Sequence, residues 1–185
     1  RKEDISMYYN MQVHSAYDLL NSTIKYESLF SKLAKDNQKS VVIVDPNMYG
    51  AIKAYKASKK AGINLIQGLE VSLGYGIGLL KFNLLCKAEK MFYKLLEIST
   101  KFMNGEEWTV EDFANDMIDY REDFVLIVVD ELRDSMEFSY LKNLLSKYDF
   151  YFGFNESFQV GLYSDYDNIV YTKPSFYLNK EHYQQ

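Results

Sequence analysis

Hydrophobic and polar positions along the chain predict strands and helices in alternation. Short continuous apolar runs, typical of buried strands, are separated by stretches in which apolar residues recur at helical spacing. Residues 40–45 (SVVIVD) form such a run, and Leu29, Phe30 and Leu33 mark one face of a helix. The predicted strands cover residues 8–13, 40–45, 63–73, 76–86, 124–130, 150–155 and 168–172, and the predicted helices cover 26–36, 48–61, 88–103, 109–120 and 135–147.

Three local signals mark where these elements begin and end. Gly62 follows the second helix, where a left-handed residue commonly ends a helix. Residues 74–76 (GYG) predict a hairpin turn between two strands. Thr109 and Asp112 have the spacing of a capping box, which predicts a helix start.

Repeated strand–helix units predict parallel strands with right-handed crossovers, and so an α/β barrel or a doubly wound sheet. In both architectures ligands bind at the carboxyl ends of the strands. We therefore single out the polar residues at or near strand ends: His14, Asp45, Glu70, Lys81, Asp130, Asn155 and Lys173.

Composition indicates one globular domain spanning residues 1–185. The chain is 48% hydrophobic and 25% charged, and it has no linker-like or low-complexity tract. No apolar run reaches the roughly 18 residues of a membrane span, so we expect no membrane contact. The one cysteine excludes an internal disulfide and favours a reducing compartment. We expect a cytoplasmic protein.

Charge argues against sequence-specific DNA recognition by this domain. The formal net charge is −5, which opposes tracking of duplex phosphates. The basic residues are nearly all lysine, whereas bidentate recognition of guanine or phosphate prefers arginine.

His14, Asp45 and Glu70 are the candidate metal ligands that the residues themselves indicate. One imidazole and two carboxylates near three successive strand ends are a ligand set that suits a divalent metal with an open position. The alternative is structural: a half-buried histidine bonded to a backbone carbonyl, and two solvated carboxylates.

Several stretches resemble the PHP (polymerase and histidinol phosphatase) domain found at the N-terminus of bacterial DNA polymerase III alpha subunits. The similarity covers nearly the whole chain in order and spacing. Its most specific block is KKAGINLIQGLEV, and the matching stretches are residues 12–20, 44–57, 59–71, 84–99 and 177–181.

This resemblance implies a distorted, TIM-barrel-related (β/α)7 barrel whose strand ends hold metal ions in active relatives. The family pattern is largely lost here. Its opening His-x-His is Gln12-Val-His14, its Asp-His is Asp45-Pro46, and a family histidine falls at Lys81. Glu70 is kept, and Asp130 aligns with a family cysteine. The closing Asn-Asp-x-His is replaced by residues 173–176 (KPSF).

The pattern therefore predicts a degenerate metal site with no catalytic residue and no cofactor. We expect Lys81 and Lys173 to neutralise Asp45 and Glu70, so that ion pairs replace the metal. The alternative is one zinc or manganese ion held by vestigial ligands, namely His14, Asp45, Glu70 and Asp130.

By the same resemblance, the chain is expected to be the N-terminal part of a DNA-directed DNA polymerase active in replication. Its expected partners are the polymerase body of the same polypeptide and a proofreading exonuclease subunit, and its expected role is structural. Two alternatives stay open. One is a residual metal-dependent phosphoesterase or proofreading exonuclease, and the other is a free-standing binding protein.

Overall fold

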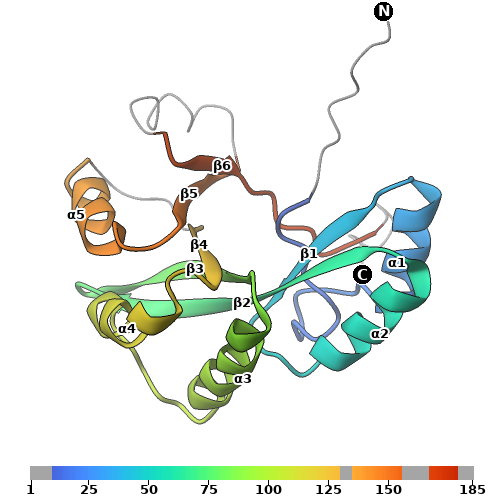
Figure 1. Cartoon of the computed structure of the whole chain (residues 1–185), viewed down its shortest axis with the longest axis horizontal. Helices are drawn as coiled ribbons and strands as arrows, with labels where there is room; N and C mark the ends of the chain where they lie inside the picture. The colour runs from blue at the N-terminus through green and yellow to red at the C-terminus, as the bar shows by residue number, and fades with distance from the viewer. Residues whose placement is uncertain (1–9, 130–134, 156–166, 179–185) are drawn as a thin grey trace, which may run out of the picture.

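A single curled sheet forms the centre of the molecule (Figure 1). The computed structural model describes residues 10–129, 135–155 and 167–178. Its strands follow one another in chain order, β1-β2-β3-β4-β5-β6. The strands are β1 (Ser40–Asp45), β2 (Asn64–Tyr75), β3 (Gly78–Cys86), β4 (Phe124–Val128), β5 (Phe150–Phe154) and β6 (Ile169–Tyr171).

Helices lie outside the curl and are amphipathic, as their apolar spacing predicts. α1 and α2 lie beside β1 at one end of the molecule, and α3, α4 and α5 lie toward the other (Figure 1). The helices are α1 (Tyr26–Lys35), α2 (Ala51–Ala61), α3 (Glu89–Met103), α4 (Val110–Asp116) and α5 (Ser135–Leu145), with a 3₁₀ turn, η1, at Ile118–Tyr120.

The sheet is mixed, which differs from the all-parallel arrangement that repeated strand–helix units predict. β1 and β2 are parallel, as are β4, β5 and β6. The predicted hairpin around Gly76 makes β2 and β3 antiparallel, and β3 is also antiparallel to β4. The hairpin reverses the chain once, so β3 alone runs against the other strands.

Val13 closes the curl between its two ends. It forms isolated parallel bridges to Ile43 in β1 and to Ser175, which follows β6. The amide of His14 donates to the carbonyl of Ser175 at 2.9 Å, and the amide of Val44 donates to the carbonyl of Val13 at 2.9 Å. A strand was predicted at residues 8–13; residues 8 and 9 lie outside the described part, and within it only the bridge at Val13 forms.

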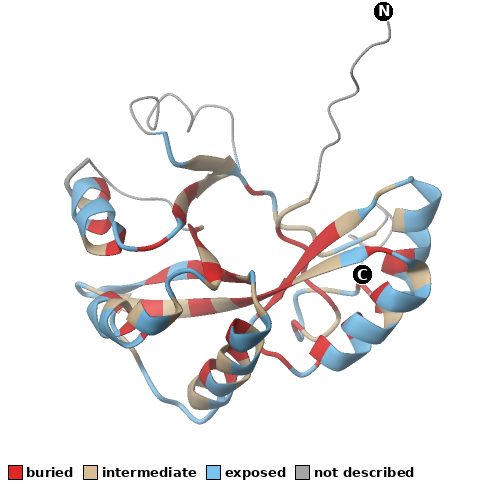
Figure 2. Ribbon diagram, viewed as in Figure 1, coloured by how far each residue is buried: buried red, intermediate tan, exposed pale blue. Residues whose placement is uncertain are grey.

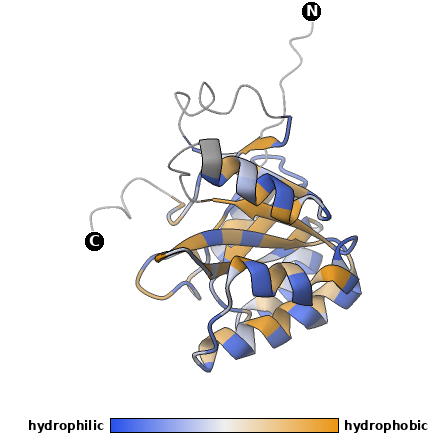
Figure 3. Cartoon of the chain, turned by 90° about the vertical axis from the view of Figure 1, so that its left-hand side faces the viewer, coloured by the Kyte–Doolittle hydropathy of each residue, from blue (hydrophilic) through white to orange (hydrophobic). Residues whose placement is uncertain are grey.

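Alternation along the strands separates an outer face, under the helices, from an inner one. The outer face holds two apolar clusters, one against α1 and α2 and the larger against α3, α4 and α5. The inner face holds a smaller cluster built on Val42, Val44, Leu85 and Ile127. Buried positions follow the strands and the sheet-facing sides of the helices (Figure 2). Hydrophobic and hydrophilic positions alternate along the same helices (Figure 3).

The predicted local signals are confirmed. Gly62 ends α2 with φ of 67°, in the left-handed region. Thr109 caps α4: its hydroxyl accepts from the amide of Asp112, whose side chain accepts from the amide of Thr109. No helix within the described ranges is long and apolar enough to cross a bilayer.

Gly50, which precedes α2, lies too close to two tyrosines to tolerate a side chain. A Cβ there would lie 2.6 Å from Cδ2 of Tyr17 and would overlap the hydroxyl of Tyr26. We expect Gly50→Ala to lower the free energy of unfolding by about 1–3 kcal/mol through overpacking. The measurement is urea unfolding monitored by circular dichroism.

Gly78→Ala is the matched control, because a Cβ at Gly78 would meet no atom within 4 Å. This variant should unfold within about 0.5 kcal/mol of the wild type. Equal stability of the two variants would contradict the packing assigned to Gly50.

Candidate functional site

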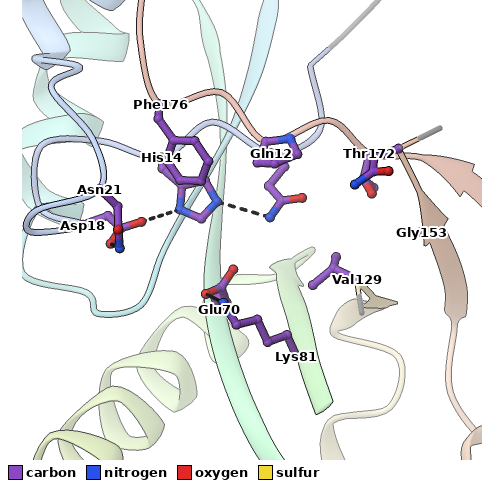
Figure 4. A pocket seen from close by; sticks show the side chains of 12 residues that line it. Gln12, His14, Asp18, Asn21, Glu70, Lys81, Val129, Gly153, Thr172 and Phe176 are labelled. Carbon is purple, nitrogen blue, oxygen red and sulfur yellow. Dashed lines mark hydrogen bonds and ion pairs between the residues drawn. The ribbon is translucent and has the colours of Figure 1, made fainter. Parts of the chain in front are cut away.

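A polar pocket of about 300 Å³ opens at the carboxyl ends of the parallel strands, where the fold predicts a site. His14, which follows the bridge at Val13, contributes to its wall, and so do residues that follow β4, β5 and β6. Figure 4 shows His14 and Gln12 above Glu70 and Lys81. The lining residues are Gln12, His14, Asp18, Asn21, Glu70, Lys81, Val129, Gly153, Asn155, Thr172, Pro174 and Phe176.

His14 is buried and held from three sides. Its Nδ1 lies 2.9 Å from Oδ2 of Asp18, a close contact that is not aligned as a hydrogen bond. Its Nε2 lies 3.2 Å from the amide nitrogen of Gln12, and the ring stacks on Phe176 with centroids 4.6 Å apart. Because an amide nitrogen only donates, Gln12 is the donor in this contact with Nε2. The lone pair that a metal ion would need is therefore already used.

Glu70 and Lys81 face each other across the β2–β3 hairpin. Nζ of Lys81 lies 3.5 Å from Oε1 of Glu70. The predicted pairing of Lys81 with Glu70 thus forms, although Lys81 is 52% exposed and Glu70 is 15% exposed. Solvent screening at such exposure limits the pair to about 0–1 kcal/mol.

Asp45 lies on the other face of the sheet from these residues. It follows Val41 and Ile43, which pack outward in the cluster against α1 and α2. Its Oδ1 accepts from the backbone amide of Ser15 at 2.7 Å, and its Oδ2 accepts from the hydroxyl of Ser15 at 2.6 Å.

The expectation that a lysine neutralises Asp45 is not met by these contacts, because Ser15 occupies both carboxylate oxygens. Lys173 is exposed. Asp130 lies outside the described residues.

The structure therefore brings His14 and Glu70 into the lining of one pocket, whereas Asp45 is bonded to Ser15 and does not line it. Within the described ranges, no three His, Cys, Asp or Glu side chains come close enough together to hold a metal ion. The atoms that could bind a metal ion at the pocket belong to His14 and Glu70, and they already contact Gln12, Asp18 and Lys81. This set of residues therefore does not fit a multinuclear metal centre.

Sequence reasoning missed the residues that contact Asp45 and His14. Ser15 and Asp18 belong to a loop and carry no periodic signal. Asn83, which is fully buried opposite Glu70 in the β2–β3 register, was also missed. Both polar atoms of its amide lack a hydrogen-bond partner, and ordered water usually serves such groups. An alternation argument could have placed Asn83 on the face of Lys81 and Glu70.

Burial raises the pKa of Asp45, and the hydrogen bonds from Ser15 offset only part of that rise. A raised native pKa means that the folded state holds the proton to higher pH than the unfolded chain. The stability from this group is present below the unfolded pKa of about 3.9 and is lost as pH rises through the native pKa. We expect Asp45→Asn to reduce this loss, measured by urea unfolding at a series of pH values.

Asp112→Asn is the control of opposite sign. Hydrogen bonds from the backbone and hydroxyl of Thr109 lower the pKa of Asp112, so its stabilisation is lost as pH falls through the native pKa. A pH profile of Asp45→Asn that matches the wild type would contradict the assignment.

The Lys81–Glu70 pair is tested by a double-mutant cycle. Lys81→Met and Glu70→Gln, alone and together, should give a coupling free energy of about 0.2–1 kcal/mol, because the pair is partly exposed. Thermal or urea unfolding of the four proteins measures it. A coupling of zero would leave Lys81 with no part in neutralising Glu70.

Comparison with known proteins identifies the family of the chain. Residues 10–148 match the PHP domain family. DNA polymerase III subunit alpha of Mycoplasma genitalium is 30% identical over 122 residues, which cover 66% of this chain and 13% of the relative. The Bacillus subtilis protein of the same name is 40% identical over 95 residues, covering 49% of this chain and 8% of the relative. The chain thus spans a small part of the length of these relatives.

Solved structures with low sequence identity share the fold. A chain from Bifidobacterium adolescentis, assigned as a metal-dependent phosphoesterase, aligns with a TM-score of 0.62 and 9% identity over 89% of this chain and 86% of its own. An amidohydrolase from Chromobacterium violaceum aligns with a TM-score of 0.64 and 10% identity over 92% of this chain and 87% of its own. The expected TIM-barrel-related α/β fold is confirmed, and the chain belongs to the PHP domain family.

Proposed function

We propose that this chain is the N-terminal PHP module of a bacterial replicative polymerase, the DNA polymerase III alpha subunit, and that it serves a structural and docking role. The observation that carries the proposal is the internal pairing of the polar pocket. Nε2 of His14 accepts from Gln12, Nδ1 faces Asp18, and Glu70 faces Lys81. A hydrolytic centre needs open donors and an open coordination position.

The physical cost of reopening the pocket supports the same view. A cation entering it would have to displace the ammonium group of Lys81 from Glu70 and the amide of Gln12 from His14. Two like charges at about 4 Å repel by about 1 kcal/mol in water and by about 4 kcal/mol near a protein surface. The polymerase body of the same polypeptide is the proposed principal partner, and a proofreading exonuclease subunit is a second.

One observation favours a second candidate function, a residual metal-dependent phosphoesterase or proofreading exonuclease. His14 and Glu70 still line one pocket at the strand ends, and a structural neighbour is assigned as a metal-dependent phosphoesterase. The ligands predicted for it are His14, Asp45, Glu70 and Asp130, of which Asp130 lies outside the described residues. A free-standing binding protein is distinguished from both by the length of the native polypeptide.

Metal content tests the proposal directly. Wild type and His14→Ala are dialysed against zinc and against manganese, and bound metal is measured by elemental mass spectrometry. We expect no stoichiometric ion in either protein and no hydrolysis of a phosphodiester or of single-stranded DNA. A stoichiometric ion that is lost in His14→Ala, together with hydrolysis, would establish the second function instead.

The double variant Gln12→His with Lys81→His serves as the gain-of-binding control. It replaces the two side chains that engage His14 and Glu70 with imidazole donors. We expect it to retain more zinc than the wild type, which would show that the assay detects a reopened site.

A further inference from the structure

The two ends of the domain carry opposite charge. Eight acidic residues and one basic residue fall between residues 104 and 123, around α4 and η1. In contrast, α2 carries four lysines and no acidic residue, although the whole chain has a net charge of −5. α4 and α2 lie toward opposite ends of the molecule (Figure 1). The α2 lysines are Lys53, Lys56, Lys59 and Lys60.

These four lysines are not balanced locally. Elsewhere in the described ranges, six lysines lie within 4 Å of a carboxylate: Lys32, Lys81, Lys87, Lys90, Lys94 and Lys101. No described carboxylate lies within that distance of an α2 ammonium group. Lys53 and Lys59 instead lie over the rings of Tyr17 and Tyr55. The uncompensated charge makes the exposed side of α2 an attractive surface for an anionic group.

An apolar groove of about 560 Å³ runs beside this charge, between α2 and α3. α2 contributes Ile52 and Tyr55, α3 contributes Glu89, Phe92 and Tyr93, and Gln67 and Lys87 also line the groove. Ile52, Tyr55 and Tyr93 are each more than half exposed. The buried side of α2 uses small residues, chiefly Ala51, Ala54 and Ser58, so its large side chains project outward. Exposed aromatic and aliphatic side chains gathered in one groove are typical of a protein-binding surface.

We propose that the α2–α3 groove binds an acidic polypeptide segment that inserts a large apolar side chain. The apolar side chain would lie between Ile52, Tyr55 and Tyr93, while Asp or Glu residues on either side would meet Lys56 and Lys59. Charge complementarity selects this occupant: Lys56 and Lys59 on α2 and Lys87 in the lining outnumber Glu89, which opposes a basic segment, and the apolar side chains add contact area that a phosphate backbone would not use. The inference rests on the proposed docking role and identifies the surface that performs it.

Selection from a random 16-residue peptide library displayed on phage tests the groove, with the 185-residue chain as bait. The expected peptides combine at least two Asp or Glu residues with one Trp, Phe or Leu. Chemical-shift changes in the ¹⁵N-labelled chain should map to α2 and α3. Lack of enrichment, enrichment of peptides without acidic residues, or mapping elsewhere would overturn the proposal.

Matched variants separate the groove from charge in general. Lys56→Glu with Lys59→Glu, and Ile52→Ser with Tyr55→Ser, should each weaken binding of a selected peptide at least tenfold. Lys35→Glu with Lys39→Glu makes the same charge change on and after α1, and Tyr49→Ser removes an exposed aromatic outside the groove; both should change the dissociation constant less than threefold. Equal losses in the α1 control would overturn the proposal.

Two further measurements identify the competing occupants. The surface would be assigned to nucleic acid by the following result. No peptide is enriched, a poly-dT oligonucleotide binds, and Lys56→Glu with Lys59→Glu abolishes that binding. Salt-sensitive dimerisation in sedimentation would assign it to a second copy of this chain. The metal assay tests the proposed function independently of the groove. A bound ion with hydrolysis would overturn the proposed function, whereas a failed peptide selection would overturn only the assignment of the groove.

Discussion

The buried carboxylate of Asp45 determines where the loop that carries His14 can lie. Ser15 donates hydrogen bonds to both carboxylate oxygens, one from its backbone amide and one from its hydroxyl. These two bonds hold Ser15, the residue after His14, at the end of β1. Tyr26 of α1 adds a third polar group, with its hydroxyl 3.1 Å from that of Ser15. A buried charge is stable only when such partners surround it. The pocket, the loop and the α1 layer therefore depend on one anchor.

This anchor holds the loop through contacts made outside the pocket, because Asp45 does not line the pocket. In this chain Gln12 and Asp18 contact His14, Lys81 contacts Glu70, and the inner face also holds an apolar cluster on Val42, Val44, Leu85 and Ile127. The loop position comes from Asp45 on the outer face, so it does not depend on an ion in the pocket.

Most of the fold could be predicted from the pattern of apolar residues, and the site only in part. Ser40–Asp45 was predicted with its observed bounds, because a continuous apolar run between polar flanks has one interpretation. The same run hides the orientation of Asp45, since Val41 to Val44 are apolar on both faces. The antiparallel pairing of β3 with β4 was not predicted, because two helices lie between them and such a connection normally returns a parallel strand. The partners of His14 lie in a loop, where spacing carries no information.

The bridges of Val13 have a consequence for how the chain acquires its structure. Residue 13 hydrogen-bonds to β1, about 30 residues away, and its neighbours Gln12 and His14 hydrogen-bond to Ser175, near the other end of the described chain. During synthesis the first partner is available early, and the second only once Ser175 has been made. Until then the open edge of the sheet exposes unpaired amides and carbonyls, which favour aggregation. Final closure is thus a late folding step with a high loop-closure entropy, and the pocket cannot exist before it.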